Sequence, residues 1–385
     1  MKETKEKIKK EKNKRKRLKR YWRCMAIYAG IVLALNLLSR ITAWCDFYAD
    51  HVFWIWAESY GRFTSLFPFS VGEVEILIAV FILVGAIVMG ISLCFLRKKE
   101  RKGYKLFAIR YEKATLAFLL TAGLIMTLNC SMLYHCSYLL DDTQAERQFS
   151  EERLRELRNY VVTKCNTLSA QVEREADGTI KKRADCERLV REAVSGLKEE
   201  YPRFSGYIPR PKGLWSSYYM YLTDMIGYYF PFSMEANYNT YINAVQYPYT
   251  TAHELSHLKG YMYEKEANFF AFLACAKSED TLLQYSAYLN ILDYVDKDYA
   301  DCVSQEEYQK QVQVVDQVWE DDWCYDPDTE EALQEREEEG ESLLSSEVVQ
   351  EAQQTFTDSY LEYYGAEASY SEVTELLLQY YEGKL

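Results

Sequence analysis

The pentapeptide His253-Glu254-Leu255-Ser256-His257 is the most informative stretch of this 385-residue chain. Two residues four positions apart on an α-helix lie on the same face, so the two histidine side chains can converge on one metal ion. Glu254 lies about 100° further around the helix, where its carboxylate can reach a metal-activated water instead of the metal. This is the zincin pattern, and it predicts a zinc-binding helix. The alternative is a helix with two surface histidines and an ion-pairing glutamate.

A catalytic zinc site needs three protein ligands and an open position for water. The chain has four histidines, and the two outside the pentapeptide are distant in sequence, so a glutamate is the favoured third ligand. Glu264 and Glu266 follow closely, but they lie about 200° apart around a helix, so only one can face the metal. The face of Glu264 continues through Asn268, which favours Glu264 as the ligand. Asn268, one turn on, is expected to hold either a histidine ligand or the Glu264 carboxylate by a hydrogen bond. Glu266 is the weaker candidate.

These residues predict metal-assisted hydrolysis. Zinc lowers the pKa of its bound water to about 7 and polarises a carbonyl group. Glu254 is then the expected general base, which later delivers the proton to the leaving amine. The oxyanion needs a further donor, and the sequence does not choose between Arg203, Arg210 and the many tyrosines that precede the pentapeptide.

Charge is distributed unevenly along the chain. Residues 1–113 contain 23 Lys and Arg against 10 Asp and Glu, whereas residues 114–385 contain 22 against 48. This asymmetry indicates a membrane topology. An acidic C-terminal part would repel phosphate backbones, so nucleic acid is not an expected partner. The basic run within residues 1–20 is therefore interpreted as a topogenic tail, with a nucleic-acid arm as the alternative.

Three apolar stretches are long enough to cross a bilayer, which takes about 20 residues. They cover approximately residues 24–44, 74–96 and 114–139. A cleaved signal peptide is the alternative for the first stretch, but no small-x-small cleavage site follows it. The lipid bilayer is therefore an expected partner.

The loops between these stretches predict the orientation. Residues 97–113 contain eight Lys and Arg, whereas residues 45–72 contain one. Lys- and Arg-rich loops stay on the cytoplasmic side, so we expect a multi-pass protein of the cell membrane with a cytoplasmic N-terminus. The expected organisation is a basic tail, a three-helix membrane region and an extracytoplasmic domain, over residues 1–23, 24–139 and 140–385.

The expected fold is mainly α, with three transmembrane helices followed by an α-rich, zincin-like domain that has a few short strands. Residues 45–72 are interpreted as a loop with aromatic residues at the lipid–water interface. Residues 141–200 have the periodicity of two amphipathic helices. Residues 201–250 are rich in proline, glycine and tyrosine and predict loops with one or two short strands. The tyrosines either pack in the domain or line a substrate cleft.

The ten cysteines include no CxxC pair, which argues against a zinc ribbon. Five of them lie in the expected extracytoplasmic domain. Oxidation there could pair Cys165 with Cys186, or Cys302 with Cys324. Sequence alone does not decide whether either pair forms.

The chain resembles a family of bacterial membrane proteins, domain-of-unknown-function family 3810, over most of its length and most specifically in the block from Gly227 to Cys275. The resemblance rests on the pentapeptide, on Glu264-x-Glu266-Ala267-Asn268-Phe269, and on the upstream segments 227–232 and 235–239. It implies a zinc metallopeptidase of the gluzincin type, with Glu264 as third ligand and Asn268 as its support. Glu235 is a further weak site candidate, and we expect Glu235-Ala236-Asn237 to form an edge strand beside the cleft.

The sequence thus predicts a membrane-anchored zinc metallopeptidase that hydrolyses a peptide or protein substrate at the extracytoplasmic face. His253, His257 and Glu264 are the expected zinc ligands, and Glu254 the general base. One alternative is a catalytically silent sensor or scaffold with a zincin fold. The other is a hydrolase of a non-peptide amide of the cell envelope.

Overall fold

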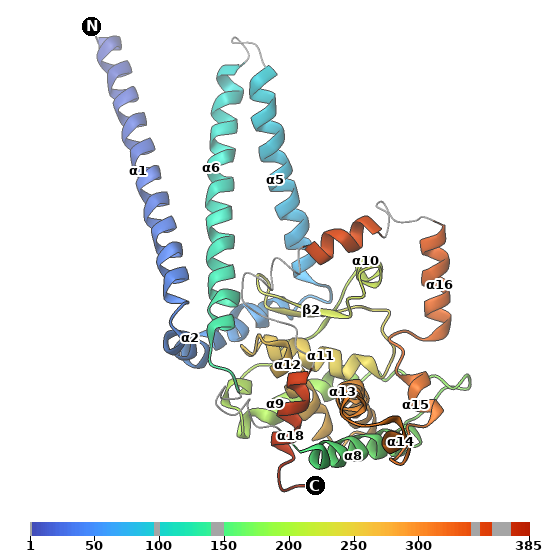
Figure 1. The fold of residues 1–385 in the computed structure, drawn as a ribbon. Helices are drawn as coiled ribbons and strands as arrows, with labels where there is room; N and C mark the ends of the chain where they lie inside the picture. Colours follow the sequence, from blue (N-terminus) through green and yellow to red (C-terminus); the bar gives the residue numbers. More distant parts are fainter. Residues whose placement is uncertain (1, 96–100, 140–149, 340–346, 356–370) are drawn as a thin grey trace.

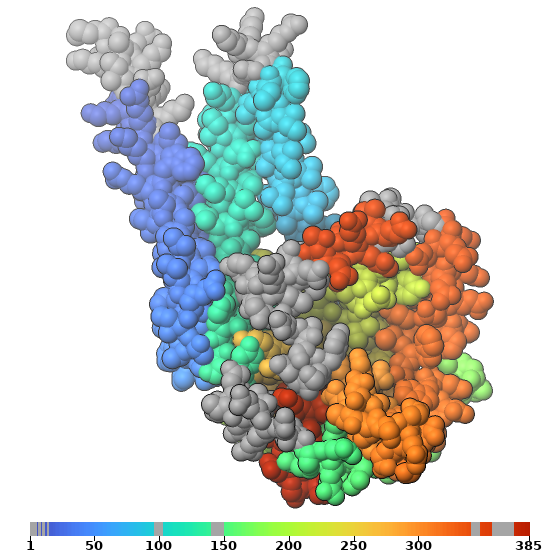
Figure 2. Space-filling view, in the orientation of Figure 1, coloured from blue at the N-terminus to red at the C-terminus, as the bar shows by residue number. Residues whose placement is uncertain are grey.

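A computed structural model describes residues 2–95, 101–139, 150–339, 347–355 and 371–385 (Figure 1). The fold is mainly helical, as predicted. Three long helices project from one side of an α-rich body, as both Figure 1 and Figure 2 show. They are α1 (Lys2–Leu38), α5 (Val71–Phe95) and α6 (Arg101–Met126). The stretches long and apolar enough to cross a membrane are Arg15–Leu38, Val71–Phe95 and Gly103–His135, the last of which continues past the end of α6.

The number of expected spans is confirmed, but the first ends earlier than residue 44. Helix α1 stops at Leu38, and the chain turns at the exposed, charged Arg40 before the next helix begins at Thr42. Cys45 and Tyr48 then point into the body, where both are buried. Residues 42–44 therefore belong to the body's first helix and not to the spanning helix.

Helices α1 and α6 run in the same direction. The hydroxyl of Tyr28 donates to Oγ1 of Thr121 at 3.0 Å, and Oγ of Ser39 lies 3.2 Å from Oγ of Ser131. The two pairs are separated by 93 and 92 positions in the sequence. A constant offset means that the helices are parallel, as is required if they are the first and third of three successive spans.

The body is built from helices that bury their apolar faces in one core. The amphipathic helices expected within residues 141–200 are present as α8 (Glu151–Ser169) and α9 (Cys186–Gly196), and Leu157 and Val161 of α8 are fully buried. The larger helices that pack with them are α11 (Gln246–His257), α12 (Glu264–Ala276), α13 (Thr281–Cys302) and α18 (Ser371–Tyr380). The other helices of the body are η5 (Leu197–Glu199), η6 (Pro202–Phe204), α10 (Ser217–Tyr221), α14 (Gln305–Gln309), α15 (Asp316–Asp321) and α16 (Pro327–Glu338).

The segment after the first span is helical, so its interpretation as a loop was wrong. It comprises α2 (Thr42–Tyr48), η1 (Ala49–Phe53), α3 (Trp54–Trp56), η2 (Ala57–Gly61) and α4 (Arg62–Thr64). Ala49, Phe53 and Ala57 repeat every four residues, so they share one helix face. All three are buried in the core. This face was not recognised because the surrounding aromatic residues suggested a membrane interface.

The end of the third span contributes to the same core. Beyond α6 the chain continues through η3 (Thr127–Ser131) and η4 (Leu133–His135). Met132 and Leu133 are almost completely buried together with residues of α11, α12 and α13. The packed core therefore includes residues on both sides of position 140.

A small three-stranded sheet lies between α11 and the start of α5. Its strands are β1 (Lys212–Gly213), β2 (Gly227–Phe230) and β3 (Glu235–Tyr238), in the order β1-β3-β2. β3 is parallel to β1 and antiparallel to β2. The expectation that residues 235–237 form an edge strand is wrong, because β3 is the central strand. β2 is the edge strand, since Gly227 to Phe230 pair only with β3 among the described residues.

Among the described residues, the four cysteines of the two expected pairs are free thiols: Cys165, Cys186, Cys302 and Cys324. Neither Cys165–Cys186 nor Cys302–Cys324 is bonded. Cys165 and Cys186 are buried separately in the core, where they pack as small apolar residues.

Candidate metal centre

Two helices and the turn between them build the centre. α11 carries the pentapeptide, and the chain reverses at Gly260 to start α12 at Glu264. Gly260 has a φ of +91°, a left-handed conformation that favours glycine at a helix C-terminus. The N–H of Tyr261 donates to the carbonyl of Ser256 at 3.2 Å and closes the turn. The first turn of α12 is thereby brought against the last turns of α11.

The side chains of His253, His257 and Glu264 converge. Nε2 of His253 lies 3.1 Å from Nε2 of His257 and 3.1 Å from Oε2 of Glu264. Nε2 of His257 lies 3.6 Å from Oε1 of Glu264. Ligand atoms at zinc–ligand distances of 2.0–2.2 Å in a tetrahedral site are about 3.3–3.6 Å apart. The three groups are therefore spaced as a zinc ion would require, within a few tenths of an ångström.

Both imidazole rings are held by hydrogen bonds at their other nitrogen. Nδ1 of His253 is 2.7 Å from Oδ1 of Asn268, and Nδ1 of His257 is 2.8 Å from the carbonyl oxygen of Tyr261. Both partners are acceptors, so in the neutral form of each ring Nδ1 carries the hydrogen and Nε2 presents a lone pair to the shared point. Asn268 lies where the helical periodicity predicted it.

The charges of the three groups are coupled. Burial opposes the charged form of His253, but the hydrogen bond and charge of Glu264 raise the pKa of His253 to about 9. Burial likewise opposes ionisation of Glu264, yet His253 lowers its pKa to about 2. Burial lowers the pKa of His257 to about 4. Without a metal, one proton on His253 therefore balances the Glu264 carboxylate, and a cation would take over that role.

Glu254 is buried beside this group without being part of it. Burial raises the pKa of its carboxyl to about 8. Its Oε2 atom is buried and has no hydrogen-bond partner among the described residues. Buried polar atoms are nearly always hydrogen-bonded in folded proteins. The unpaired carboxylate oxygen is therefore free to accept a hydrogen bond from a water or a substrate group.

The first residue of the edge strand approaches Glu254 very closely. A Cβ atom added to Gly227 would lie 2.6 Å from Oε1 of Glu254 and 3.0 Å from Cγ2 of Thr250. Only glycine fits at this position without displacing the glutamate. The start of β2 is thus fixed against the carboxylate.

One family of known proteins matches most of the chain. The family described as "Protein of unknown function (DUF3810)" matches residues 48–378. The chain belongs to the DUF3810 family. No curated protein and no solved structure matches it. The region shared with DUF3810 contains α5, α6, the sheet and all four residues of the candidate centre.

Two of the weaker site candidates lie elsewhere in this DUF3810 protein. Glu266 points away from the histidines, is buried, and accepts a hydrogen bond from the N–H of Leu139. Burial raises the pKa of its carboxyl to about 7. Glu235 is completely buried on the other face of the sheet, where it accepts from the N–H groups of Val71 and Gly72 at 3.2 and 2.9 Å. It caps the N-terminus of α5.

The two arginines considered as oxyanion donors are engaged with carboxylates instead. Nε of Arg203 donates to Asp50 at 2.6 Å, and Arg210 forms two hydrogen bonds with Glu187 at 2.9 and 2.8 Å. The contact of Gly227 with Glu254 was not predicted. A Gly-Tyr-Tyr-Phe strand is a signal for a close approach, but sequence alone does not name its partner.

Proposed function

We propose that this DUF3810 protein is a membrane-anchored, zinc-dependent peptidase acting at the extracytoplasmic face. The observation that carries the proposal is the convergence of His253, His257 and Glu264 beside the unpaired carboxylate of Glu254. Two imidazoles and one carboxylate are the donor set of a common class of catalytic zinc site. The second-nitrogen hydrogen bonds that such sites use are also present.

His253, His257 and Glu264 are the residues that would hold the ion, which supplies Lewis acidity and an acidified water when it is bound. Glu254 receives the proton of the attacking water on its free oxygen. It then returns this proton to the nitrogen of the departing amine, so no net proton is consumed at the carboxylate. Burial holds the pKa of Glu254 near neutrality, at about 8, which suits a group that both accepts and donates a proton.

The edge strand favours a peptide over a non-peptide amide as substrate. β2 pairs with β3 on one side, and no described strand pairs with its other side. An extended peptide can add to such an edge through main-chain hydrogen bonds. Because β2 begins at Gly227, against Glu254, a peptide bound in this way would run past the general base.

The spanning helices support the proposed location. Three helices can cross a membrane, and the basic loop of residues 97–113 favours the cytoplasm. This orientation places the candidate centre outside. The orientation can be tested with an engineered glycosylation or labelling site in the loop after α13. This site should be modified only from the extracytoplasmic side.

The decisive experiment compares the full-length protein in detergent with three variants. The wild type should contain about one zinc ion per chain and cleave peptides in a diverse peptide library. Glu254→Gln should keep the zinc and lose the cleavage. Glu264→Ala should lose the zinc, whereas Glu266→Ala should keep it. Absence of zinc from the wild type would refute the proposal, and zinc without cleavage would leave a metal-binding scaffold as the better explanation.

A further inference from the structure

A continuous series of aromatic rings surrounds the N-terminal end of α5. The ring centroids of Tyr60 and Phe63 are 6.0 Å apart, those of Phe63 and Phe67 are 5.4 Å apart, and those of Phe67 and Phe69 are 5.6 Å apart. Trp215 stacks on Phe69 at 5.3 Å. We call these five residues the aromatic arc. It joins the helical segment after the first span to the loop after β1.

Trp215 is fixed close to the start of the second span. The backbone N–H groups of Trp215 and Ser216 donate to the carboxylate of Glu73 at 3.0 and 2.8 Å. Glu73 lies in the first turn of α5, which begins at Val71. A residue far along the chain is thus held within about one helical turn of the apolar stretch.

The arc is exposed in part, whereas Tyr60, Phe67 and Phe69 are half-buried. Trp215 is 66% exposed, Phe63 51% and Leu66 78%. The apolar surface continues directly onto α5, where Leu77 is 55% and Phe81 75% exposed. Exposed apolar surface of this extent is unusual on a soluble protein and marks an interaction site. Its continuity with a spanning helix indicates lipid as the partner, because tryptophan and other aromatic residues are enriched at the boundary between hydrocarbon and water.

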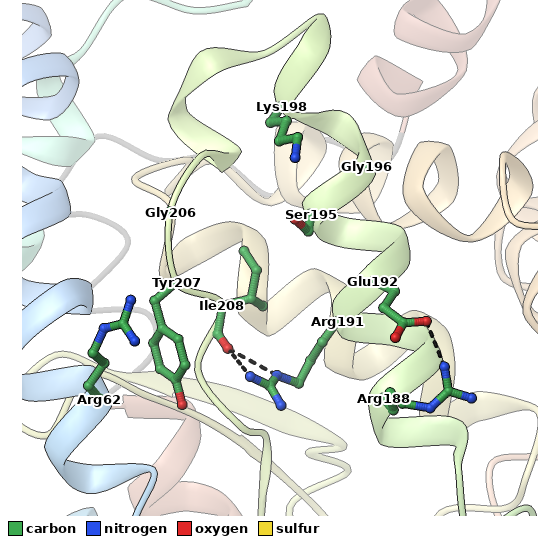
Figure 3. A pocket seen from close by; sticks show the side chains of 10 residues that line it. All are labelled: Arg62, Arg188, Arg191, Glu192, Ser195, Gly196, Lys198, Gly206, Tyr207 and Ile208. Carbon is green, nitrogen blue, oxygen red and sulfur yellow. Dashed lines mark hydrogen bonds and ion pairs between the residues drawn. The ribbon is translucent and has the colours of Figure 1, made fainter.

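Charge does not explain binding at this surface. Arg62 beside the arc forms an ion pair with Glu58 at 2.7 Å. It also borders a basic groove, shown in Figure 3, in which Arg188 binds Glu192 and Arg191 binds the carbonyl oxygen of Ile208. These guanidinium groups already have partners. The attraction is therefore apolar, and a zwitterionic membrane is sufficient for it.

We propose that the aromatic arc is a membrane-docking surface that rests in the lipid–water interface of the bilayer crossed by α5. Through Trp215, the body itself contacts lipid, and the hydrogen bonds to Glu73 hold it there. The body does not swing freely on its spans. This inference is independent of the proposed peptidase activity.

Lipid labelling of the wild-type protein tests the proposal. The full chain is reconstituted in phosphatidylcholine vesicles that contain a phospholipid with a photoreactive group near its headgroup. After illumination, peptides containing residues 60–69 and 213–219 should carry lipid. Trp323 is an internal control, because it is 67% exposed and follows α15, which lies away from the foot of α5 (Figure 1). Labelling of the peptide with Trp323 as strong as that with Trp215 would overturn the proposal.

A matched pair of variants gives a second measurement. Tryptophan fluorescence is quenched by phosphatidylcholine brominated near the top of its acyl chains. Trp215→Phe keeps a ring against Phe69 and should reduce the quenched part of the emission, whereas Trp323→Phe should reduce the unquenched part. A quenched part that is unchanged in Trp215→Phe contradicts the proposal. If Trp215→Phe fails to fold, the labelling of the wild type still decides.

Discussion

Nδ1 of His253 lies 2.7 Å from Oδ1 of Asn268, although the two residues are on different helices. Asn268 is one turn after Glu264 on α12. The helix that offers the carboxylate therefore also orients the first histidine. His257 is held differently, by the backbone carbonyl of Tyr261 at 2.8 Å. A side chain can be replaced by mutation, whereas a backbone carbonyl group cannot. The orientation of the histidine rings can therefore be tested through Asn268.

Asn268→Ala should weaken zinc binding about 10- to 100-fold, because the ring of His253 loses the acceptor that fixes its tautomer. The measurement is a competition titration against a chelator of known affinity. Asn268→Asp keeps an acceptor and should retain most of the affinity. Asn290→Ala is the control, since the Asn290 amide donates only to its own helix, at the carbonyl of Ser286. Equal zinc affinity of Asn268→Ala and the wild type would show that this hydrogen bond does not support the site.

Helical periodicity was sufficient to predict that these side chains converge, because they all lie within two adjacent helices. His253, His257, Glu264 and Asn268 are related by spacings of one turn and by one short connection. Periodicity says nothing about contacts between distant segments. The contact of Gly227 with Glu254 and the capping of α5 by Glu235 both depend on sheet register and tertiary packing. They could not be predicted from the order of residues.

The structure of the segment after the first span was predicted wrongly for a different reason. Ala49, Phe53 and Ala57 have the spacing of a helix face, but the many aromatic residues around them also fit a membrane interface. The structure contains residues of both kinds, because Phe53 is buried while Phe63 is exposed. Composition alone does not separate residues that face the core from residues that face lipid.

Gly227→Ala should reduce hydrolysis while zinc content stays unchanged. The added methyl group would lie 2.6 Å from Oε1 of Glu254, so either the glutamate or the strand must move. We expect a loss of about 1–3 kcal/mol in the free energy of unfolding. Gly196→Ala is the control, because a Cβ atom there meets nothing within 4 Å. The two variants are compared by thermal unfolding, metal analysis and peptide cleavage. Full activity in Gly227→Ala would show that Glu254 need not stay in this position.

Zinc binding should become weaker as the pH falls below about 9. In the metal-free centre the pKa of His253 is about 9, so at neutral pH this residue carries a proton that zinc must displace. The pKa values of His257 and Glu264 are about 4 and 2, so neither contributes a proton at pH 7. The apparent affinity should thus fall about tenfold per pH unit between pH 9 and pH 5.

The variant Glu254→Gln isolates this proton, because glutamine does not titrate. Calorimetric titration of that variant with zinc, in buffers of different ionisation enthalpy, counts the protons released. At about pH 6, where a zinc-bound water with a pKa of about 7 keeps most of its protons, we expect about one proton per zinc. A count of zero would mean that His253 is already neutral in the metal-free protein.

Glu235→Ala should destabilise the protein without affecting zinc content. The carboxylate is completely buried and also accepts from the hydroxyl groups of Ser233 at 2.8 Å and Ser70 at 3.4 Å. Its removal leaves buried donors at the start of α5 unpaired, at a cost of about 3 kcal/mol in the free energy of unfolding. Glu338→Ala, at an exposed position on α16, should change little. Loss of zinc from a folded Glu235→Ala variant would instead indicate that this residue takes part in the centre.

A fragment consisting of residues 140–385 should fail to fold cooperatively, because the turn of the metal centre rests on residues outside it. A Cβ atom at Gly260 would lie 3.4 Å from Phe53 and 3.6 Å from Leu133, so both side chains pack directly against the connection between α11 and α12. Phe53→Ala alone should cost about 3–5 kcal/mol in the full-length protein. The fragment 140–385 lacks Phe53 and Leu133, and it also lacks the buried helix face formed by Ala49 and Ala57. Far-ultraviolet circular dichroism during heating and zinc analysis would compare it with residues 39–385. A cooperative transition and full zinc content in the shorter fragment would show that the centre folds without its membrane-proximal segments.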